Sequence, residues 1–490
     1  MTLSLLCLVP FVGGLVSATV PARPKVWAFG FALATLVVAI IACAAADAED
    51  HTWIGALGVH WALGLDGLGR LMVLLTAALV PIVMVAAVKD HGPRWYSWAL
   101  VLEAFALVVF CAQDVFTFYV FFEATLIPAY FMIGGWGGAG RARAALKFLM
   151  YQLGGGLVLL GAVIGLFVES ADAGTPSYLI SDLQQLDIGT TAGRWIFVAL
   201  FTAFAVKAPL FPLHTWLADT TEQATPPTSV LLVCVLDKIG TFGMIRLCLG
   251  LVPEASRWAT PVVVALALVS IVYGAFLAIG QDDLLRLIGL TSLSHFGLIT
   301  LGIFALSSQG VSGAILYMVN HGVATAAMFL VAGFLITRRG TASISSMRGL
   351  EKAAPVMAGL FLVAGLATAG LPGLSQFVSE ILVLISAFDY HWFVGAIAVT
   401  AVVLAAIYVL WAYQRLFTGT VDPDEPAAAP TRDLTRREVG VLAPLVAGLL
   451  VFGFYPAPLL DAANPLVDDV LQHAGVTDAP PVVAAPEEGQ

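Results

Sequence analysis

Long apolar stretches dominate the chain, and short polar segments repeatedly separate them. Each stretch holds about 20 residues, the length that an α-helix needs to cross the hydrocarbon core of a bilayer. Charged residues, glycine or proline mark the ends of the stretches, as is typical of helix boundaries. The fourteen predicted helices cover residues 2–19, 26–45, 67–88, 95–112, 115–135, 145–169, 195–218, 226–250, 259–280, 284–306, 310–336, 354–387, 392–414 and 438–458.

The composition also indicates a polytopic, all-α membrane protein. Of the 490 residues, 60% are hydrophobic and 11% are charged, whereas soluble domains have about 45–50% apolar and about 25% charged residues. The net charge of −10 and the lack of a basic run exclude binding to nucleic-acid phosphates. The five cysteines are isolated in apolar stretches, and nucleotide-binding motifs are lacking. We therefore expect no metal, cofactor or redox centre on this chain.

Basic residues are distributed unequally between the two sides of the predicted bundle. Sixteen of the 22 lysines and arginines fall in loops on one side, four on the other side and two inside spans. Because cytoplasmic loops carry the excess of basic residues, the richer side is predicted to be cytoplasmic. We therefore expect a multi-pass protein of the cell (inner) membrane, in contact with the lipid bilayer, with both termini on the non-cytoplasmic side.

Two predicted spans contain helix-breaking residues near the middle of the membrane. The seventh contains Pro209 and Pro212, and the twelfth contains Gly370, Pro372 and Gly373. Such residues interrupt or weaken the hydrogen bonds of a helix. Non-helical backbone at this depth is tolerated only where protein or a water-filled cavity covers it, so both breaks are predicted to face inward.

The positions of the breaks indicate an internal repeat. If helices 4–8 and 9–13 form two blocks, each break lies in the fourth helix of its block, and the odd number of spans gives the blocks opposite orientations. The predicted parts are three N-terminal helices (1–94), two inverted five-helix repeats (95–250 and 259–414), a cytoplasmic loop with the last helix (415–458) and a weakly ordered external tail (459–490).

Several ionisable residues lie inside the predicted spans, where each charge costs about 2.5–3.5 kcal/mol on insertion scales. Lysine, carboxylate and imidazole groups can exchange protons, whereas two histidines 26 residues apart do not form a metal-ligand set. We therefore predict a polar file along the midplane that transfers protons. The candidate residues are Glu123, Lys207, Lys238, His295, His321 and Glu380.

Each candidate also has a structural explanation. Glu123 and Lys207 are expected to oppose each other on neighbouring helices and could be an ion pair that only holds these helices together. Asp237 could neutralise Lys238, the histidines could pack between helices, and Glu380 could cap the local break. A complete set of such costly groups nevertheless favours function. Interfacial or accessory positions on the proton path are assigned to Glu103, His214 and Asp237.

Seven segments, in order over roughly residues 67–460, carry a family resemblance. They are FYVFFEATLIPAYFMIGGWGG, KFLMYQLGGG, FAVKAPLFPLHTWLADT, TSVLLVCVLDKIGTFGMIRL, DDLLRLIGLTSLSHFGLITLGI, NHGVATAAMFLVAGFL and LPGLSQFVSEILVL. These segments resemble the antiporter-like membrane subunits of proton-pumping NADH:quinone oxidoreductase, respiratory complex I. The resemblance implies that the six candidates are the family's helix-five glutamate, its lysine partner in helix seven, the central lysine of helix eight, two connecting histidines and a terminal residue in helix twelve.

The identity of some residues refines this resemblance. Glu380 resembles the M-type subunits, since L-type and N-type subunits and the related cation/proton antiporters usually have lysine there. The chain departs from the family pattern at HTWLADTTEQATPPTS after the first break, at Asp237, where an apolar residue is usual, and at Leu285, where lysine is frequent. These departures affect the connection between helices seven and eight and the partner of Lys238.

The resemblance implies one proton channel of a redox-driven pump, and hence a subunit of an enzyme whose NADH, FMN, iron–sulfur clusters and quinone are used on other subunits. Quinone reduction would perturb the pair of Glu123 and Lys207 and drive a proton from Lys238 towards Glu380. L-like and N-like antiporter-like subunits are expected on either side. Two alternatives remain, namely a subunit of a multisubunit cation/proton antiporter or hydrogenase-linked pump, and a non-transporting membrane scaffold.

Overall fold

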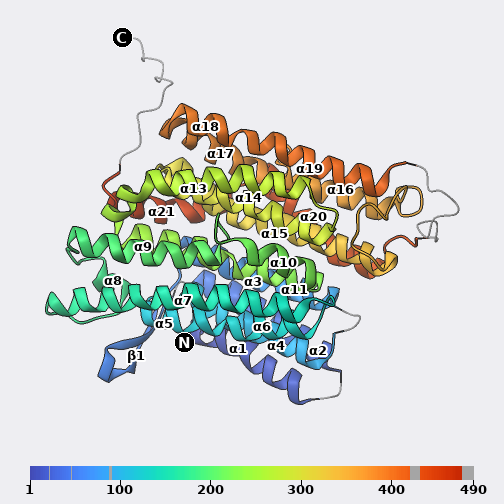
Figure 1. The fold of residues 1–490 in the computed structure, drawn as a ribbon. Coiled ribbons are helices and arrows are strands. Elements are labelled where there is room, and N and C mark those ends of the chain that lie inside the picture. Colours follow the sequence, from blue (N-terminus) through green and yellow to red (C-terminus); the bar gives the residue numbers. More distant parts are fainter. Residues whose placement is uncertain (21–22, 46, 88–90, 420–430, 477–490) are drawn as a thin grey trace, which may run out of the picture.

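The computed structural model describes residues 1–20, 23–45, 47–87, 91–419 and 431–476. Its helices lie side by side in one elongated bundle (Figure 1). The elements before residue 250 are α1 (Thr2–Thr19), α2 (Pro24–Ala45), β1 (Glu49–Ile54), η1 (Gly55–Leu57), β2 (Val59–Leu63), α3 (Gly67–Ala86), α4 (Pro93–Cys111), α5 (Val115–Ala124), α6 (Leu126–Gly135), α7 (Arg141–Asp172), α8 (Ile180–Leu183), α9 (Thr190–Lys207), α10 (Thr215–Gln223), α11 (Pro226–Leu231), η2 (Leu232–Leu236), α12 (Lys238–Gly243) and η3 (Met244–Leu249).

The named elements of the second half of the chain are all helices. Its elements are α13 (Pro253–Ile279), α14 (Leu284–Phe304), α15 (Ser308–Arg339), α16 (Pro355–Thr368), α17 (Ser375–Tyr390), α18 (Trp392–Ala398), α19 (Thr400–Phe417), α20 (Arg436–Phe454) and α21 (Ala457–His473). The prediction of a polytopic all-α membrane protein is confirmed. Residues 88 and 420–430, which the predicted third helix and cytoplasmic loop include, lie outside the described residues.

Eleven helical segments in the described part of the chain are long and apolar enough to cross a membrane. They correspond to eleven of the fourteen predicted spans. The other three are the seventh, eighth and twelfth, and each of them is interrupted. The interruptions therefore account for the difference between the two numbers.

The breaks in the seventh and twelfth spans lie where proline and glycine predicted them. The seventh is α9 and α10, separated by residues 208–214, and the twelfth is α16 and α17, separated by residues 369–374. Protein groups bond the backbone of the first break: Phe211 donates its N–H to Ser270 Oγ at 2.9 Å, and the Trp216 indole donates to the Val206 carbonyl at 3.0 Å. These bonds replace part of the lost helical ladder, as burial in a membrane requires.

The eighth span departs from the predicted regular helix over residues 226–250. Two π-helical segments, η2 and η3, flank the short α-helix α12. A π-helical turn holds an extra residue and shifts the side chains that follow around the helix axis, and such turns are frequent at functional sites. Between Leu232 and Leu249 no proline signals the irregularity.

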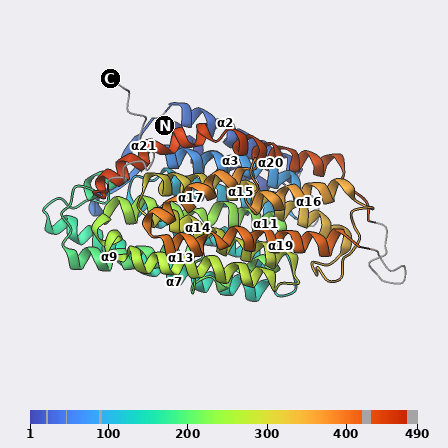
Figure 2. The ribbon, with the colours of Figure 1, turned by 90° about the horizontal axis from the view of Figure 1, so that it is seen from above.

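Helices α14 and α15 form the centre of the bundle, as Figure 2 shows. Every residue of α14 except Arg286 is buried, and α15 is buried along most of its length. A helix that is apolar around its whole circumference can be enclosed in this way. The two predicted file histidines lie on these central helices, out of reach of the surrounding lipid.

One prediction about the C-terminal tail is wrong. Residues 457–473 form helix α21, whereas the acidic stretch from 459 onwards was predicted to be weakly ordered. Leu459, Ala463 and Val467 lie on one face and are buried with two neighbours further along the helix. Helix α21 packs against α3 and α15. Its order comes from this tertiary contact, which the overall acidic composition does not reveal. Residues 477–490 of the tail lie outside the described residues.

Candidate functional site

Lys207 ends α9 at the edge of the first helix break and is completely buried. Its ammonium group donates to Thr125 Oγ1 at 3.2 Å and lies 4.4 Å from the centroid of the Phe122 ring. Thr125 itself is the single residue between α5 and α6, which together still form one span. A neutral hydroxyl and an aromatic face therefore provide the contacts of this charge.

Glu123 lies two residues before this junction, and its side chain does not contact Lys207 directly. No ion pair within 4.0 Å joins Glu123 to Lys207, both of which the structure describes, although the two groups interact electrostatically. One carboxylate oxygen of Glu123 is buried without a hydrogen-bond partner among the described residues. Glu123 and Lys207 thus interact electrostatically, but they do not form the direct ion pair that was predicted.

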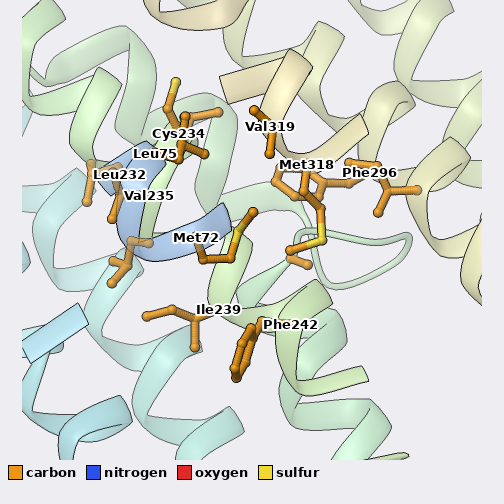
Figure 3. Packing of buried hydrophobic residues seen from close by; sticks show 14 of the residues in the cluster. Met72, Leu75, Leu232, Cys234, Val235, Ile239, Phe242, Phe296, Met318 and Val319 are labelled. Atoms are coloured by element: carbon orange, nitrogen blue, oxygen red, sulfur yellow. The ribbon is translucent and has the colours of Figure 1, made fainter. Parts of the chain in front are cut away.

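Lys238 begins α12 and is also completely buried. Its Nζ lies 2.6 Å from His321 Nδ1 on α15 and 4.4 Å from the centroid of the Phe296 ring on α14. Figure 3 shows apolar side chains of α3, η2, α12, α14 and α15 packed together in this part of the core, among them Ile239, the chain neighbour of Lys238. The amine and the imidazole are therefore held in a dry environment, where a charge interacts strongly with its neighbours.

Asp237 lies beside Lys238 in the chain, completely buried, and both of its carboxylate oxygens have no hydrogen-bond partner in the described part of the protein. It interacts electrostatically with Lys238 and with Lys207. A buried carboxylate without hydrogen bonds is costly, and two nearby lysines offset part of this cost. Asp237 is therefore placed to connect the two lysines electrostatically.

Two glycines bring α12 close to the end of α9. A methyl group on Gly240 would lie 2.5 Å from the Ala208 backbone nitrogen, and one on Gly243 would lie 2.4 Å from the Phe204 ring. Larger side chains would separate the two helices. This close packing brings the segment that carries Lys238 against the break that carries Lys207.

The second half of the site is a continuous hydrogen-bonded chain. His295 Nδ1 on α14 lies 2.6 Å from the hydroxyl of Tyr317, and that hydroxyl donates to Glu380 Oε1 at 2.7 Å. The hydroxyl of Tyr408 lies 3.3 Å from His295 Nε2. The structure thus brings together His295 and Glu380, two predicted residues, through a tyrosine that the sequence analysis did not identify.

The series of hydrogen bonds is interrupted between the two histidines, His295 and His321. The rings of His295 and His321 have centroids 5.2 Å apart, but no hydrogen bond joins them in the described structure, and His321 Nε2 is buried without a partner. The site therefore consists of a Lys238–His321 pair and a chain from His295 to Glu380. A proton crosses between them only after a side chain moves or a water enters.

Each of the two glutamates of the candidate file lies against a glycine. A methyl group on Gly156 of α7 would lie 1.6 Å from Glu123 Oε1, and one on Gly370 would lie 1.8 Å from Glu380 Oε2. Gly370 also has a φ of +69°, a conformation that side chains rarely adopt. The space that each carboxylate occupies thus depends on the absence of a Cβ atom on a neighbouring segment.

The remaining accessory candidates lie outside this hydrogen-bonded set. Glu103 is buried in α4, and neither of its oxygens has a hydrogen-bond partner among the described residues. His214 lies in the first helix break with its ring near Phe211 and Tyr273, at centroid distances of 6.1 and 5.5 Å. No hydrogen bond connects either residue to the six principal candidates in the described part of the chain, so their accessory roles stay predictions.

Sequence reasoning missed three hydroxyl groups: those of Thr125, Tyr317 and Tyr408. Tyr317 precedes His321 by four residues, and this spacing places both side chains on one face of a helix. That signal could have identified Tyr317 from the sequence. Tyr408 and Thr125 carry no comparable signal, because only the tertiary fold brings them to His295 and Lys207.

The position of Asp237 leads to a first prediction. Replacement of Asp237 by Asn keeps its size but removes the negative charge that both lysines experience. We expect proton translocation by the assembled complex to slow by about tenfold, the effect of ~1.4 kcal/mol of lost electrostatic coupling. Proton uptake into inverted membrane vesicles measures this rate. The matched variant Asp461→Asn, on the exposed side of α21, should pump normally. Equal rates in both variants would contradict a role for Asp237.

Comparison with known proteins identifies the family of this chain. The family model described as NADH:quinone oxidoreductase/Mrp antiporter, TM, matches residues 112–405. The chain is 44% identical to NADH-quinone oxidoreductase subunit M of Mycobacterium tuberculosis, over 99% of this chain and 96% of the relative. It is 37% identical to subunit M of Rhodobacter capsulatus, over 87% of this chain and 84% of the relative.

Solved structures give the same result for the fold. A chain of respiratory complex I from Thermus thermophilus with bound NADH superposes with a TM-score of 0.90 at 33% identity, covering 97% of this chain and 100% of that chain. A chain of the Mrp complex from Dietzia shares the fold, with a TM-score of 0.86 at 21% identity and coverage of 96% and 98%. Together with the family match and the high identity to subunit M, these findings establish that the chain belongs to the NADH:quinone oxidoreductase/Mrp antiporter family, within its subunit M group.

Proposed function

We propose that this chain is the antiporter-like M subunit of a proton-pumping NADH:quinone oxidoreductase and that it moves protons through its buried file. The observation that carries the proposal is the placement of ionisable residues on the three interrupted spans. Lys207 lies at the break of the seventh, Lys238 between the π-helical segments of the eighth, and Glu380 beyond the break of the twelfth. Interrupted helices are typical of transporter sites near the membrane midplane.

The missing hydrogen bonds between neighbouring groups of the file are consistent with a proton pump. A continuous hydrogen-bonded wire across the membrane would let protons return down their gradient. Here hydrogen bonds are lacking between Lys207 and Lys238 and between His321 and His295, all of which the structure describes. We infer that an electrostatic change at Glu123 and Lys207 alters the proton affinity of Lys238, and that proton transfer to His321 and onward to His295 and Glu380 follows.

The electrostatic energies are of the required size. Moving one charge against an opposing potential costs about 2.3 kcal/mol per 100 mV. Two unit charges about 4 Å apart interact by roughly 4 kcal/mol at an effective dielectric constant near 20. Making or breaking one such interaction in the buried file can therefore supply the free energy for a proton. In the family, the redox reaction that would start this change takes place on other subunits, which would hold FMN, iron–sulfur clusters and quinone and oxidise NADH.

The exposed apices of the helix breaks support the proposed partners. Leu371 and Pro372 in the second break, and Pro212 in the first, are exposed on this chain, whereas both breaks were predicted to face inward. Lipid-exposed irregular backbone is not tolerated at membrane depth, so another protein should cover these sites. We propose that neighbouring antiporter-like subunits, L-like on one side and N-like on the other, provide this cover.

We also propose an internal repeat and an orientation in the membrane. Helices α4 to η3 would form the first five-helix repeat and helices α13 to α19 the second, inverted one. The distribution of basic residues would place both termini on the non-cytoplasmic side of the cell membrane. A subunit of a cation/proton antiporter is the second candidate, favoured by the shared fold of the Mrp complex. Glu380 in place of lysine is the residue that argues against it.

Lys207→Ala tests the proposed function. In membranes where the complex assembles, we expect proton pumping and NADH:quinone activity both to fall at least about tenfold, because the charge that couples Glu123 to Asp237 is removed. Both rates are measured side by side in the same vesicles. Normal pumping with normal activity would refute a proton-transfer role for Lys207 and support a scaffold. The matched change Lys352→Ala, at an exposed loop position, should leave both rates unchanged.

A further inference from the structure

Tyr317 links three helices at the far end of the file. The residue belongs to α15 and is completely buried. Its hydroxyl lies 2.6 Å from His295 Nδ1 on α14 and 2.7 Å from Glu380 Oε1 on α17. Among the described residues, Glu380 has no other side-chain hydrogen bond. The only direct hydrogen-bonded connection between Glu380 and the rest of the described file is therefore one phenolic oxygen.

The number of hydrogens shared by His295, Tyr317 and Glu380 determines which ring nitrogen of His295 carries a hydrogen. A tyrosine hydroxyl has one proton to donate. When Glu380 is a carboxylate, Tyr317 donates that proton to it, so the contact with His295 requires a hydrogen on Nδ1 that His295 donates to the Tyr317 oxygen. The opposite nitrogen, Nε2, faces the hydroxyl of Tyr408 at 3.3 Å and can accept from it. Each hydrogen bond in this series is therefore donated in the direction from His295 towards Glu380.

We propose that the Tyr317 hydroxyl is an obligatory proton relay between His295 and Glu380, and that its orientation allows one proton to pass at a time. The proposal rests on the proposed function and assigns a further residue to it. When His295 is an imidazolium, its Nδ1–H bond breaks as an O–H bond forms on Tyr317. The original Tyr317 O–H bond breaks as an O–H bond forms on Glu380. The imidazole and the carboxylic acid are then both neutral, and Tyr317 remains neutral throughout.

The relay resets only when its hydroxyl rotates and His295, left with its hydrogen on Nε2 after the transfer, regains a hydrogen on Nδ1. After the transfer, the new hydrogen of Tyr317 points towards Nδ1 of His295, and Glu380 is protonated. A second proton cannot follow until Glu380 releases its proton and the hydroxyl turns back to the carboxylate. The gap between His321 and His295 separates this chain from the lysine side of the file during the rotation. Tyr317 would therefore limit transfer to one proton per rotation.

Tyr317→Phe in the assembled complex tests the relay, because phenylalanine keeps the ring and removes only the hydroxyl. We expect coupled proton translocation to fall by about 10²-fold, a typical effect of removing a positioned proton-transfer group. Tyr96→Phe is the matched control, since Tyr96 is also buried and its hydroxyl bonds the backbone carbonyl of Ala87, away from the file. Its pumping should stay close to that of the unmodified complex.

Two outcomes separate the relay from the proposed function. If Lys238→Met abolishes pumping but Tyr317→Phe pumps normally, the relay is refuted and the proton channel stands. If both variants pump normally, the proposed function fails as well.

A second variant keeps the test valid if Tyr317→Phe does not assemble. Tyr317→3-fluorotyrosine has nearly the same size but a more acidic hydroxyl. A relay requires its pH profile of pumping or its solvent deuterium isotope effect to change, whereas a purely structural tyrosine would leave both unchanged. An unchanged profile and isotope effect would overturn the proposal.

Discussion

Lys238→Met should abolish proton pumping while the complex still assembles. Methionine has an unbranched apolar side chain one atom shorter than that of lysine, so it fits this fully buried position. The variant lacks the amine that lies 2.6 Å from His321 Nδ1, so the file loses its central proton carrier. We expect translocation to fall by about 10²- to 10⁴-fold, the range found for positioned proton-transfer groups. Vesicle acidification driven by NADH oxidation measures it.

The control for this experiment is Lys352→Met, which makes the same chemical change at an exposed loop position. Blue-native electrophoresis of both variants would establish assembly before pumping is compared. Pumping above half of the unmodified rate in assembled Lys238→Met would contradict the assignment of Lys238 to the proton path. It would leave the buried lysine as a packing device, which is the scaffold alternative.

Gly370→Ala should reduce proton translocation by about 10²-fold, although glycine has no titratable group. The added Cβ atom would lie 1.8 Å from Glu380 Oε2, so the carboxylate has to move. Gly370 also has a φ of +69°, and a non-glycine residue in this conformation costs about 1–2 kcal/mol. A shift of about 1 Å at a reacting group can reduce a rate about 10²-fold. The change should therefore break the contact between Glu380 and Tyr317.

Gly359→Ala provides the comparison for Gly370→Ala. Gly359 lies in α16, on the other side of the same break, and a methyl group there would meet no atom within 4 Å. We expect this variant to assemble and pump normally. Infrared spectroscopy of the carboxyl region would also report whether the hydrogen bond of Glu380 changes in Gly370→Ala alone. Normal pumping by assembled Gly370→Ala would mean that the position of Glu380 is not critical.

The sequence analysis identified most residues of the candidate site because charges inside apolar spans are conspicuous. Lys207 and Lys238 lie at an interrupted helix end and at the start of a short helix between two π-helical segments, and the spans around them were predicted from hydropathy alone. Their contacts were less predictable. Lys207 was expected to contact Glu123, but it donates to Thr125. A difference of a few ångströms between neighbouring helices decides this contact, and no periodicity in the sequence encodes it.

The tertiary structure also revealed irregular and ordered segments that the positions of proline and glycine do not predict. The break at Pro209 and Pro212 followed from local chemistry, since proline lacks the N–H that a helix needs. The π-helical segments on both sides of Lys238 have no such local cause, and the order of α21 depends on contacts with α3 and α15. These features are properties of how distant segments pack.

By itself, the sequence determined the all-α membrane fold, two of the three helix interruptions and the six titratable residues of the candidate file, because hydropathy, helix breakers and buried charges are local properties of the chain. Only the tertiary structure decided how these residues are connected. The bond from Tyr317 to Glu380, the gap between the histidines and the position of Asp237 near two lysines each join segments far apart in the chain. Proton transfer depends on such distances to within about 1 Å, and packing alone sets them.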